Sequence, residues 1–309
     1  MIEEEISVAS GDIMLSGTLA QPVASKGIVL FVHGSGPMDR NQDTKGAALG
    51  TFRDLAQAVS AIGFSSLRWD KRGVGASGGN FATLGQQDLI RDIQAMIDFA
   101  AARGLGPVYL CGHSEGTALA PVAAIGRDIA GLILMCPYIT PGSEILVQQA
   151  AKSDAYVAAM TGWKGVLARA FGRPSARQAR FVARLMASKG DYLRVGFRKV
   201  PTRWLRDFAT SDVAQIHAGN TLPTLVLVAE LDAQCPPQDG AKIAALNPLA
   251  KLVELPELSH LLRHTTNADL ADYPQQVLKQ QDPRVAEVLT VWLLGQAKTA
   301  TNLPRDGNC

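Results

Sequence analysis

A serine between two glycines marks residues 109–118, YLCGHSEGTA. The pentapeptide GHSEG fits the pattern G-x-S-x-G, and it lies between a strand-like apolar run and a helix-compatible segment, TALAPVAAIG. A sharp turn at that junction holds the serine in a strained backbone conformation with its hydroxyl exposed, and side chains at Gly112 and Gly116 would collide with neighbouring backbone. The pattern predicts that Ser114 is a nucleophile and that the backbone amide of Glu115 donates to an oxyanion.

A serine hydroxyl needs a general base, and the sequence offers five histidines. His33 directly follows a buried apolar run, His113 lies inside the turn with its side chain expected to point away from the serine, and His217 lies in the linker that leaves a helical region. His264 is expected on the surface of a following helix. His260 falls in the loop after the last strand pattern, at the sheet edge where ligands bind in open α/β sheets, and we predict it to be the base.

The base needs a carboxylate that orients it, and Asp232 ends the strand-like run PTLVLVAELD at the same sheet edge. Asp239 is the nearest competitor, whereas Glu230 would point elsewhere because side chains alternate along a strand. The chain order Ser114, Asp232, His260 is the order expected of an α/β hydrolase.

The loop HGSGP follows the first buried run and can turn a second backbone amide toward the carbonyl oxygen of a substrate. Gly34 and Gly36 give this loop conformational freedom. We predict that Ser35 supplies the amide, with Gly36 as the alternative because a shift of one residue in the loop path would exchange them.

Short apolar runs alternate with helical patterns along the chain. Five consecutive apolar residues at 28–32 are typical of a strand buried on both faces, and residues 51–63 carry apolar side chains at helical spacing. Further strands are predicted in FSSLRWD, GPVYLCG, AGLILMCP, PTLVLVAELD and AKLVELP, further helices over 88–104 and 283–296, and an antiparallel hairpin in the first twenty residues. The alternation predicts an α/β fold with a mostly parallel central sheet flanked by helices.

One region lacks buried-strand patterns. From about residue 141 to residue 219 only helical segments interrupted by Gly and Pro are predicted, and residues 150–210 hold 13 Lys and Arg against 3 Asp and Glu, while the remainder holds 17 against 25. This pattern predicts a helical lid inserted after the sixth strand. The hydrolase core would then consist of residues 1–140 and 220–309, with 141–219 as the insertion.

Composition excludes several classes of protein. A chain of 309 residues that is 47% hydrophobic can bury a large core, and a net charge of +2 gives no reason to expect nucleic acid as a partner. No apolar run approaches the roughly 18 residues of a membrane span, and the acidic opening MIEEEISV is unlike an export signal. Four cysteines far apart, without a CxxC pair, argue against zinc or disulfides and suit a reducing cytoplasm, where we expect the protein.

The segment GVGASGG imitates a dinucleotide fingerprint with Gly73, Gly75 and Gly78. However, Asp70 and the two basic residues after it separate the glycines from the strand, where the fingerprint requires apolar residues and an immediate helix. A tight charged turn explains the segment better, so no cofactor is predicted. No metal is predicted either, since side chains and amides supply the proton transfer and charge stabilisation.

Taken in order, HGSGPMDRN, DKRGVGAS, GHSEG, RWLRDFATSD, AELDAQCPP and LSHLLRH resemble motifs of the α/β-hydrolase superfamily over essentially the whole chain. Within it, the chain is similar to bacterial serine esterases often labelled acyl-CoA thioester hydrolase-like or dipeptidyl-peptidase-like. The resemblance implies a carboxylesterase with Ser114, Asp232 and His260 as nucleophile, acid and base. The departures are GHSEGT, where a third glycine is common, and LSHLLRH, where the group more often has Asn before the histidine and Phe-Gln after it; they bear on substrate preference.

The resemblance also places RWLRDF near the acyl pocket, so Trp204 and Phe208 are expected to contact substrate. The further lid aromatics expected there are Trp163, Phe171 and Phe197. An acyl-CoA thioesterase or acyltransferase using the same triad is the alternative, with a peptidase or a non-catalytic binding protein less favoured.

Arg177, Arg180 and Arg184 form one stripe on a predicted amphipathic lid helix. A solvated helix face explains this stripe best. The alternatives are that the arginines attract an anionic part of a substrate or that they bind the lid to an anionic membrane surface. From the predicted triad and the resemblance, the expected partner is a small ester or thioester substrate. The sequence indicates no oligomeric state.

Overall fold

The computed structural model describes residues 2–170 and 172–302. Eight strands form one sheet in the order β1-β2-β4-β3-β5-β6-β9-β10, in which β1 and β2 run antiparallel to their neighbours and the other pairs are parallel. The strands are β1 (Ile2–Ser10), β2 (Ile13–Gln21), β3 (Ile28–Val32), β4 (Ser65–Trp69), β5 (Val108–His113), β6 (Gly131–Met135), β9 (Thr224–Ala229) and β10 (Ala250–Leu255). The expected hairpin and mostly parallel sheet are confirmed.

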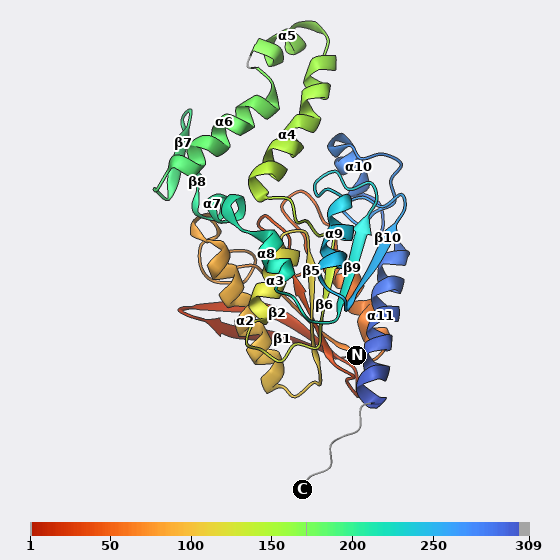
Figure 1. Ribbon diagram of the computed structural model, residues 1–309. Helices are drawn as coiled ribbons and strands as arrows, with labels where there is room; N and C mark the ends of the chain where they lie inside the picture. The colour runs from red at the N-terminus through yellow and green to blue at the C-terminus, as the bar shows by residue number, and fades with distance from the viewer. Residues whose placement is uncertain (1, 171, 303–309) are drawn as a thin grey trace.

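Helices cover both faces of this sheet (Figure 1). They are α1 (Thr51–Ala61), α2 (Gln86–Ala102), α3 (Gly116–Ala124), α9 (Gln238–Leu246) and α11 (Pro283–Asn302). The short helix α10 (Tyr273–Gln276) lies in the segment between β10 and α11, and 3-10 turns occur at Phe81–Thr83 and Leu270–Asp272. Alternate residues of β3 explain the two layers, because Ile28 and Leu30 pack with α2, α3 and α9, whereas Val29 and Phe31 pack with α1 and α11. A strand buried on both faces reads as an unbroken apolar run.

The segment between β6 and β9 contains α4 (Gly142–Ala159), α5 (Gly162–Ala170), α6 (Pro174–Ala187), α7 (Arg203–Thr210) and α8 (Val213–Ala218). It also contains the two-stranded hairpin β7 (Tyr192–Val195) and β8 (Arg198–Pro201), so the expectation of helices alone is wrong here. These strands are mostly exposed and therefore lack the apolar pattern of a buried strand. Figure 1 shows α4, α5 and α6 projecting away from the sheet, with α7 and α8 nearer to the core.

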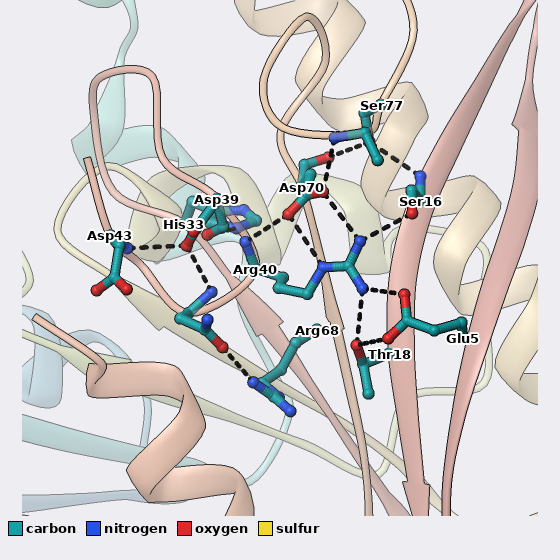
Figure 2. A network of polar contacts seen from close by, with 12 residues as sticks. Glu5, Ser16, Thr18, His33, Asp39, Arg40, Asp43, Arg68, Asp70 and Ser77 are labelled. Atoms are coloured by element: carbon teal, nitrogen blue, oxygen red, sulfur yellow. Dashed lines mark hydrogen bonds and ion pairs between the residues drawn. The ribbon is translucent and has the colours of Figure 1, made fainter. Parts of the chain in front are cut away.

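The glycine-rich segment after β4 is the predicted charged turn, and no α-helix begins between β4 and α2. Asp70 organises it, because its carboxylate accepts hydrogen bonds from the backbone amides of Ala76 (3.0 Å) and Arg40 (2.9 Å). The guanidinium of Arg40 bonds to the same carboxylate and also to Glu5, which ties the turn to the N-terminal hairpin (Figure 2). Burial alone would raise the pKa of Asp70, but these hydrogen bonds hold it below its usual value.

Cys111, Cys136 and Cys235 are buried free thiols, and Cys309 lies outside the described residues. Within the described ranges, no helix has the length and apolar character needed to cross a membrane.

Candidate active site

Ser114 lies in the turn between β5 and α3, with a backbone φ of 53°. That left-handed conformation is unfavourable for a residue with a side chain, so the turn stores strain at the serine. A Cβ at Gly112 would lie 2.4 Å from the carbonyl oxygen of Gly116, and a Cβ at Gly116 would lie 2.3 Å from that of Val32. Both distances are too short for any side chain, so both positions require glycine. The structure thus has the strained strand-to-helix turn that the sequence predicts.

His260 and Asp232 lie side by side in the loops that follow β10 and β9. His260 Nδ1 is 2.7 Å from Asp232 Oδ2, and both side chains are almost fully buried. The other carboxylate oxygen accepts hydrogen bonds from the backbone amides of Gln234 (2.7 Å) and Cys235 (2.8 Å). Burial by itself raises the pKa of Asp232, but His260 and these donors outweigh burial and lower it. Asp232 is therefore an ionised partner for the imidazole, three residues beyond the end of β9 rather than at its end.

The competing carboxylates face other groups. Asp239 Oδ2 accepts hydrogen bonds from the backbone amides of Ile139 (3.0 Å) and Thr140 (2.8 Å), where the segment after β6 begins. Glu230 accepts one from the backbone amide of Glu257. Neither is the partner of a histidine ring.

The remaining histidines also have other environments. Burial, with Lys71 nearby, lowers the pKa of His33 to about 3, and its ring bonds to the carbonyl oxygen of Asp39. Burial lowers the pKa of His217 in α8 to about 4. His264 is exposed as expected, but it forms an isolated β-bridge instead of lying on a helix.

His113 and Gln42 take a part that the sequence does not predict. Burial, together with the nearby His260, lowers the pKa of His113 to about 3, so its ring is neutral. Nε2 then donates to the backbone carbonyl of His260 (2.9 Å), while Nδ1 accepts from the amide of Gln42 (2.6 Å). This chain of bonds holds the backbone of the predicted base in place. The only local signal is the position of His113 next to the serine.

The loop of residues 33–37, which carries the predicted oxyanion donor and is called the oxyanion loop below, follows β3 and packs directly on Ser114. A Cβ at Gly34 would lie 3.2 Å from Cβ of Ser114, and Gly34 and Ser35 both line the cavity at the serine, whereas Gly36 does not. Within the described part of the chain, the backbone amides of Ser35 and Glu115 donate no hydrogen bond. Both amides are therefore available for a ligand, and the arrangement favours Ser35 over Gly36.

The cavity at Ser114 has a volume of about 60 Å³. Its lining contains both Ser114 and His260; the other lining residues are Gly34, Ser35, Met38, Gln42, Leu49, Thr51, His113, Gln234 and Leu261. None of the described residues that line it is acidic or carries a Lys or Arg side chain. Among the described residues no hydrogen bond joins the Ser114 hydroxyl to His260, and catalytic hydrogen bonds are often long before substrate binds.

Trp204 and Phe208, expected at the acyl pocket, are not among these lining residues. They stack on each other on α7 with ring centroids 5.4 Å apart, and the indole N–H of Trp204 turns inward to the carboxylate of Glu115 (2.5 Å). Trp163 and Phe197 are exposed in the projecting part, contrary to the expectation of a pocket lining, and Phe171 lies outside the described residues. The lid aromatics thus do not form one pocket above the serine.

Two groups of metal-binding side chains come together among the described residues, and both include His260. One adds His113 and Cys136, the other Asp232 and Cys235. In the first, both ring nitrogens of His113 are already hydrogen-bonded, and in the second Nδ1 of His260 is bonded to the carboxylate. In each group, ring nitrogens that could bind a metal are therefore already engaged in hydrogen bonds within the protein.

The sheet order, the strained serine and the buried His–Asp pair define an α/β hydrolase. More narrowly, the chain belongs to the hydrolase family described as serine aminopeptidase, S33, whose family model matches residues 24–267.

The individual proteins that this chain is similar to share little of its sequence. Esterase EstD of Thermotoga maritima is 27% identical over 144 residues, a match that spans 45% of this chain and 34% of that protein. The structure of Est1E from Butyrivibrio proteoclasticus with ferulic acid bound has a TM-score of 0.64 at 19% identity and covers 95% of this chain and 99% of its own. A proline iminopeptidase from Mycobacterium smegmatis has a TM-score of 0.59 at 14% identity, covering 96% and 100%. Structures this dissimilar in sequence share the fold, and the fold serves both esterases and peptidases.

Proposed function

We propose that the protein hydrolyses carboxylic esters through an acyl-enzyme on Ser114. The observation that carries this proposal is the 2.7 Å bond between His260 and Asp232, buried in the structure, with His260 lining the same cavity as the strained serine. A neutral imidazole whose Nδ1–H is held by a carboxylate presents Nε2 as the proton acceptor that a serine nucleophile needs.

In the proposed reaction the Ser114 oxygen attacks the ester carbonyl carbon while His260 takes the hydroxyl proton. The negative charge that develops on the carbonyl oxygen is stabilised by the amides of Ser35 and Glu115. His260 returns the proton to the leaving alcohol as the C–O bond breaks, and Asp232 stabilises the transient imidazolium. In the second half of the reaction, water gives a proton to His260 as it attacks the acyl carbon. His260 returns this proton to the Ser114 oxygen as the ester bond to the serine breaks, which releases the carboxylic acid.

The cavity lining favours esters over peptides. An aminopeptidase has to bind a protonated amino terminus, for which a nearby carboxylate is the natural partner, and none of the described residues lining the cavity at Ser114 is acidic. The volume of about 60 Å³ lies far below the 300–1,000 Å³ of usual ligand pockets and suits a short acyl group. An acyl-CoA thioesterase or acyltransferase would use the same triad and is separated from an esterase only by assay.

We infer that residues 141–219 act as a lid. Lys152 on α4 donates to the carbonyl oxygen of Ala233 (2.6 Å), and Gln149 donates to that of Gln234 (3.2 Å), which lines the cavity. These contacts connect the projecting helices to the loop that carries Asp232.

The test is hydrolysis of p-nitrophenyl esters and acyl-CoAs of rising chain length, combined with labelling by a fluorophosphonate probe. Ser114→Ala should lose turnover and labelling, while Ser188→Ala, at the end of α6, should keep both. Acetate and butyrate esters should react faster than long-chain esters. Labelling that persists in Ser114→Ala would refute the assignment, and activity restricted to acyl-CoAs would establish the thioesterase instead.

A further inference from the structure

A buried lysine lies behind the loop that supplies the proposed oxyanion donor. Lys71 Nζ donates to the carbonyl oxygen of Gly34 at 2.6 Å, and the Lys71 side chain is only 4% exposed. The described peptide bonds are all trans, so the C=O of Gly34 and the N–H of Ser35 belong to one planar unit and point in opposite directions. Holding the carbonyl oxygen at Lys71 therefore fixes the direction of the Ser35 N–H.

The same ammonium lies beside the side chain of the residue that carries the second proposed donor. Lys71 Nζ is 3.9 Å from the carboxylate of Glu115, which is fully buried and whose backbone amide is the other proposed donor. Burial lowers the pKa of Lys71, and the Glu115 carboxylate opposes that shift. Lys71 thus connects the two segments that supply the proposed oxyanion donors, the loop that contains Ser35 and the turn that contains Glu115.

The Glu115 carboxylate is itself held from two other elements. Its Oε1 accepts hydrogen bonds from Gln86 at the start of α2 (3.0 Å) and from the indole of Trp204 on α7 (2.5 Å). On the other side, the backbone amide of Lys71 donates to Met38, directly after the oxyanion loop. Asp70, the residue before Lys71, is held by its hydrogen bonds with the guanidinium of Arg40 (Figure 2).

We propose that Lys71, paired with Glu115, is a positioning residue of the oxyanion hole. It orients the 34–35 peptide and adds positive charge behind it, which matters most as negative charge develops in the transition state. The inference rests on the proposed esterase function.

The test separates positioning from simple support of the fold. Lys71→Met alone leaves the Glu115 carboxylate buried without its cation and is expected to lower the Tm. The double variant Lys71→Met/Glu115→Gln removes both charges and should recover most of that Tm. Arg72→Met is the matched control, because it breaks the neighbouring Arg72–Asp92 ion pair without touching the oxyanion loop.

With p-nitrophenyl acetate, the double variant should show a kcat lower by about 100-fold at an almost unchanged KM. Its affinity for a trifluoromethyl ketone, which becomes an oxyanion when Ser114 adds to it, should fall by a similar factor. Arg72→Met should keep kcat and inhibitor affinity whatever its Tm.

A double variant with kcat within threefold of the wild type, or with kcat and inhibitor affinity changing independently, would overturn the positioning role alone. A wild-type protein with neither ester hydrolysis nor labelling of Ser114 would overturn the proposed function and this inference together.

Discussion

Replacing Asp232 by Asn tests the most closely defined contact of the site. The carboxylate lies 2.7 Å from His260 Nδ1 with side chains 2% and 4% exposed, so little water screens the pair. At an effective dielectric constant of about 20, a full charge at that distance attracts an imidazolium by about 6 kcal/mol. Since each 1.4 kcal/mol is a factor of ten, kcat/KM should fall by about four orders of magnitude.

Hydrogen bonding predicts the same direction. One oxygen of Asp232 is committed to the backbone amides of Gln234 and Cys235. An Asn that keeps those bonds turns its NH₂ group toward His260, which makes Nδ1 an acceptor and puts the ring proton on Nε2. That tautomer cannot accept the proton of Ser114.

The assay is kcat/KM for p-nitrophenyl acetate, with Asp239→Asn as the matched control. Asp239 bonds to backbone amides at the start of the insertion, and an Asn oxygen can still accept those bonds, so this variant should retain activity within a few-fold. A loss below tenfold in Asp232→Asn, or an equal loss in Asp239→Asn, would refute the assignment of the acid.

Four further outcomes are expected. His260→Ala should lose at least about three orders of magnitude in kcat/KM, while the exposed His264→Ala should keep wild-type activity; equal losses would mean that the wrong histidine is assigned. Gly116→Ala should lower the free energy of unfolding in urea by about 3 kcal/mol, because its Cβ would collide with backbone atoms. Gly190→Ala should change that free energy little, because a Cβ there would be 3.8 Å from the carbonyl oxygen of Tyr192, an ordinary contact. The lowered pKa of Asp70 means that its ionised form contributes stability above its ordinary value of 3.8 and that this contribution is lost as pH falls further; Asp70→Asn should therefore flatten the acid side of the stability profile. Arg177, Arg180 and Arg184 on α6 are exposed, as a solvated helix face requires, so salt should change kcat/KM equally for an acyl-CoA and a neutral ester; a loss confined to the acyl-CoA would show instead that these arginines attract an anionic substrate.

The elements that the sequence predicts are those whose signal is local. Residues 28–32 form β3 because every side chain of the strand is buried, and an unbroken apolar run reports that directly. The turn at Ser114 is predictable because its two glycines are needed for steric reasons within a few residues of the serine. The hairpin β7–β8 escaped prediction because exposed strands carry no apolar period.

Contacts between distant segments could not be read in the same way. Gln42 and His113 are 71 positions apart, and nothing near either residue indicates the other. Lys71 reads as part of a charged turn, and only the fold shows its ammonium directed at Gly34. Trp204 is predicted to contact substrate, and nothing in its local sequence indicates that its indole N–H donates to Glu115, because a helical pattern does not say which partner such a donor will find.

The neighbouring strands β6 and β9 are joined by residues 136–223, and this connection has a consequence for how the family can diversify. The entropic cost of closing a loop rises by only about 0.6 kcal/mol for each doubling of its length. Natural variation can therefore lengthen, shorten or exchange α4 to α6 with little effect on strand pairing, provided that α7 and α8 keep their contacts with the core. The predicted reacting groups lie on loops of the core, whereas α4 to α6 project from it. Mutations can therefore change the projecting helices without moving the reacting groups. Homologues with the same serine, aspartate and histidine are accordingly expected to differ most in residues 142–187, which contain α4 to α6.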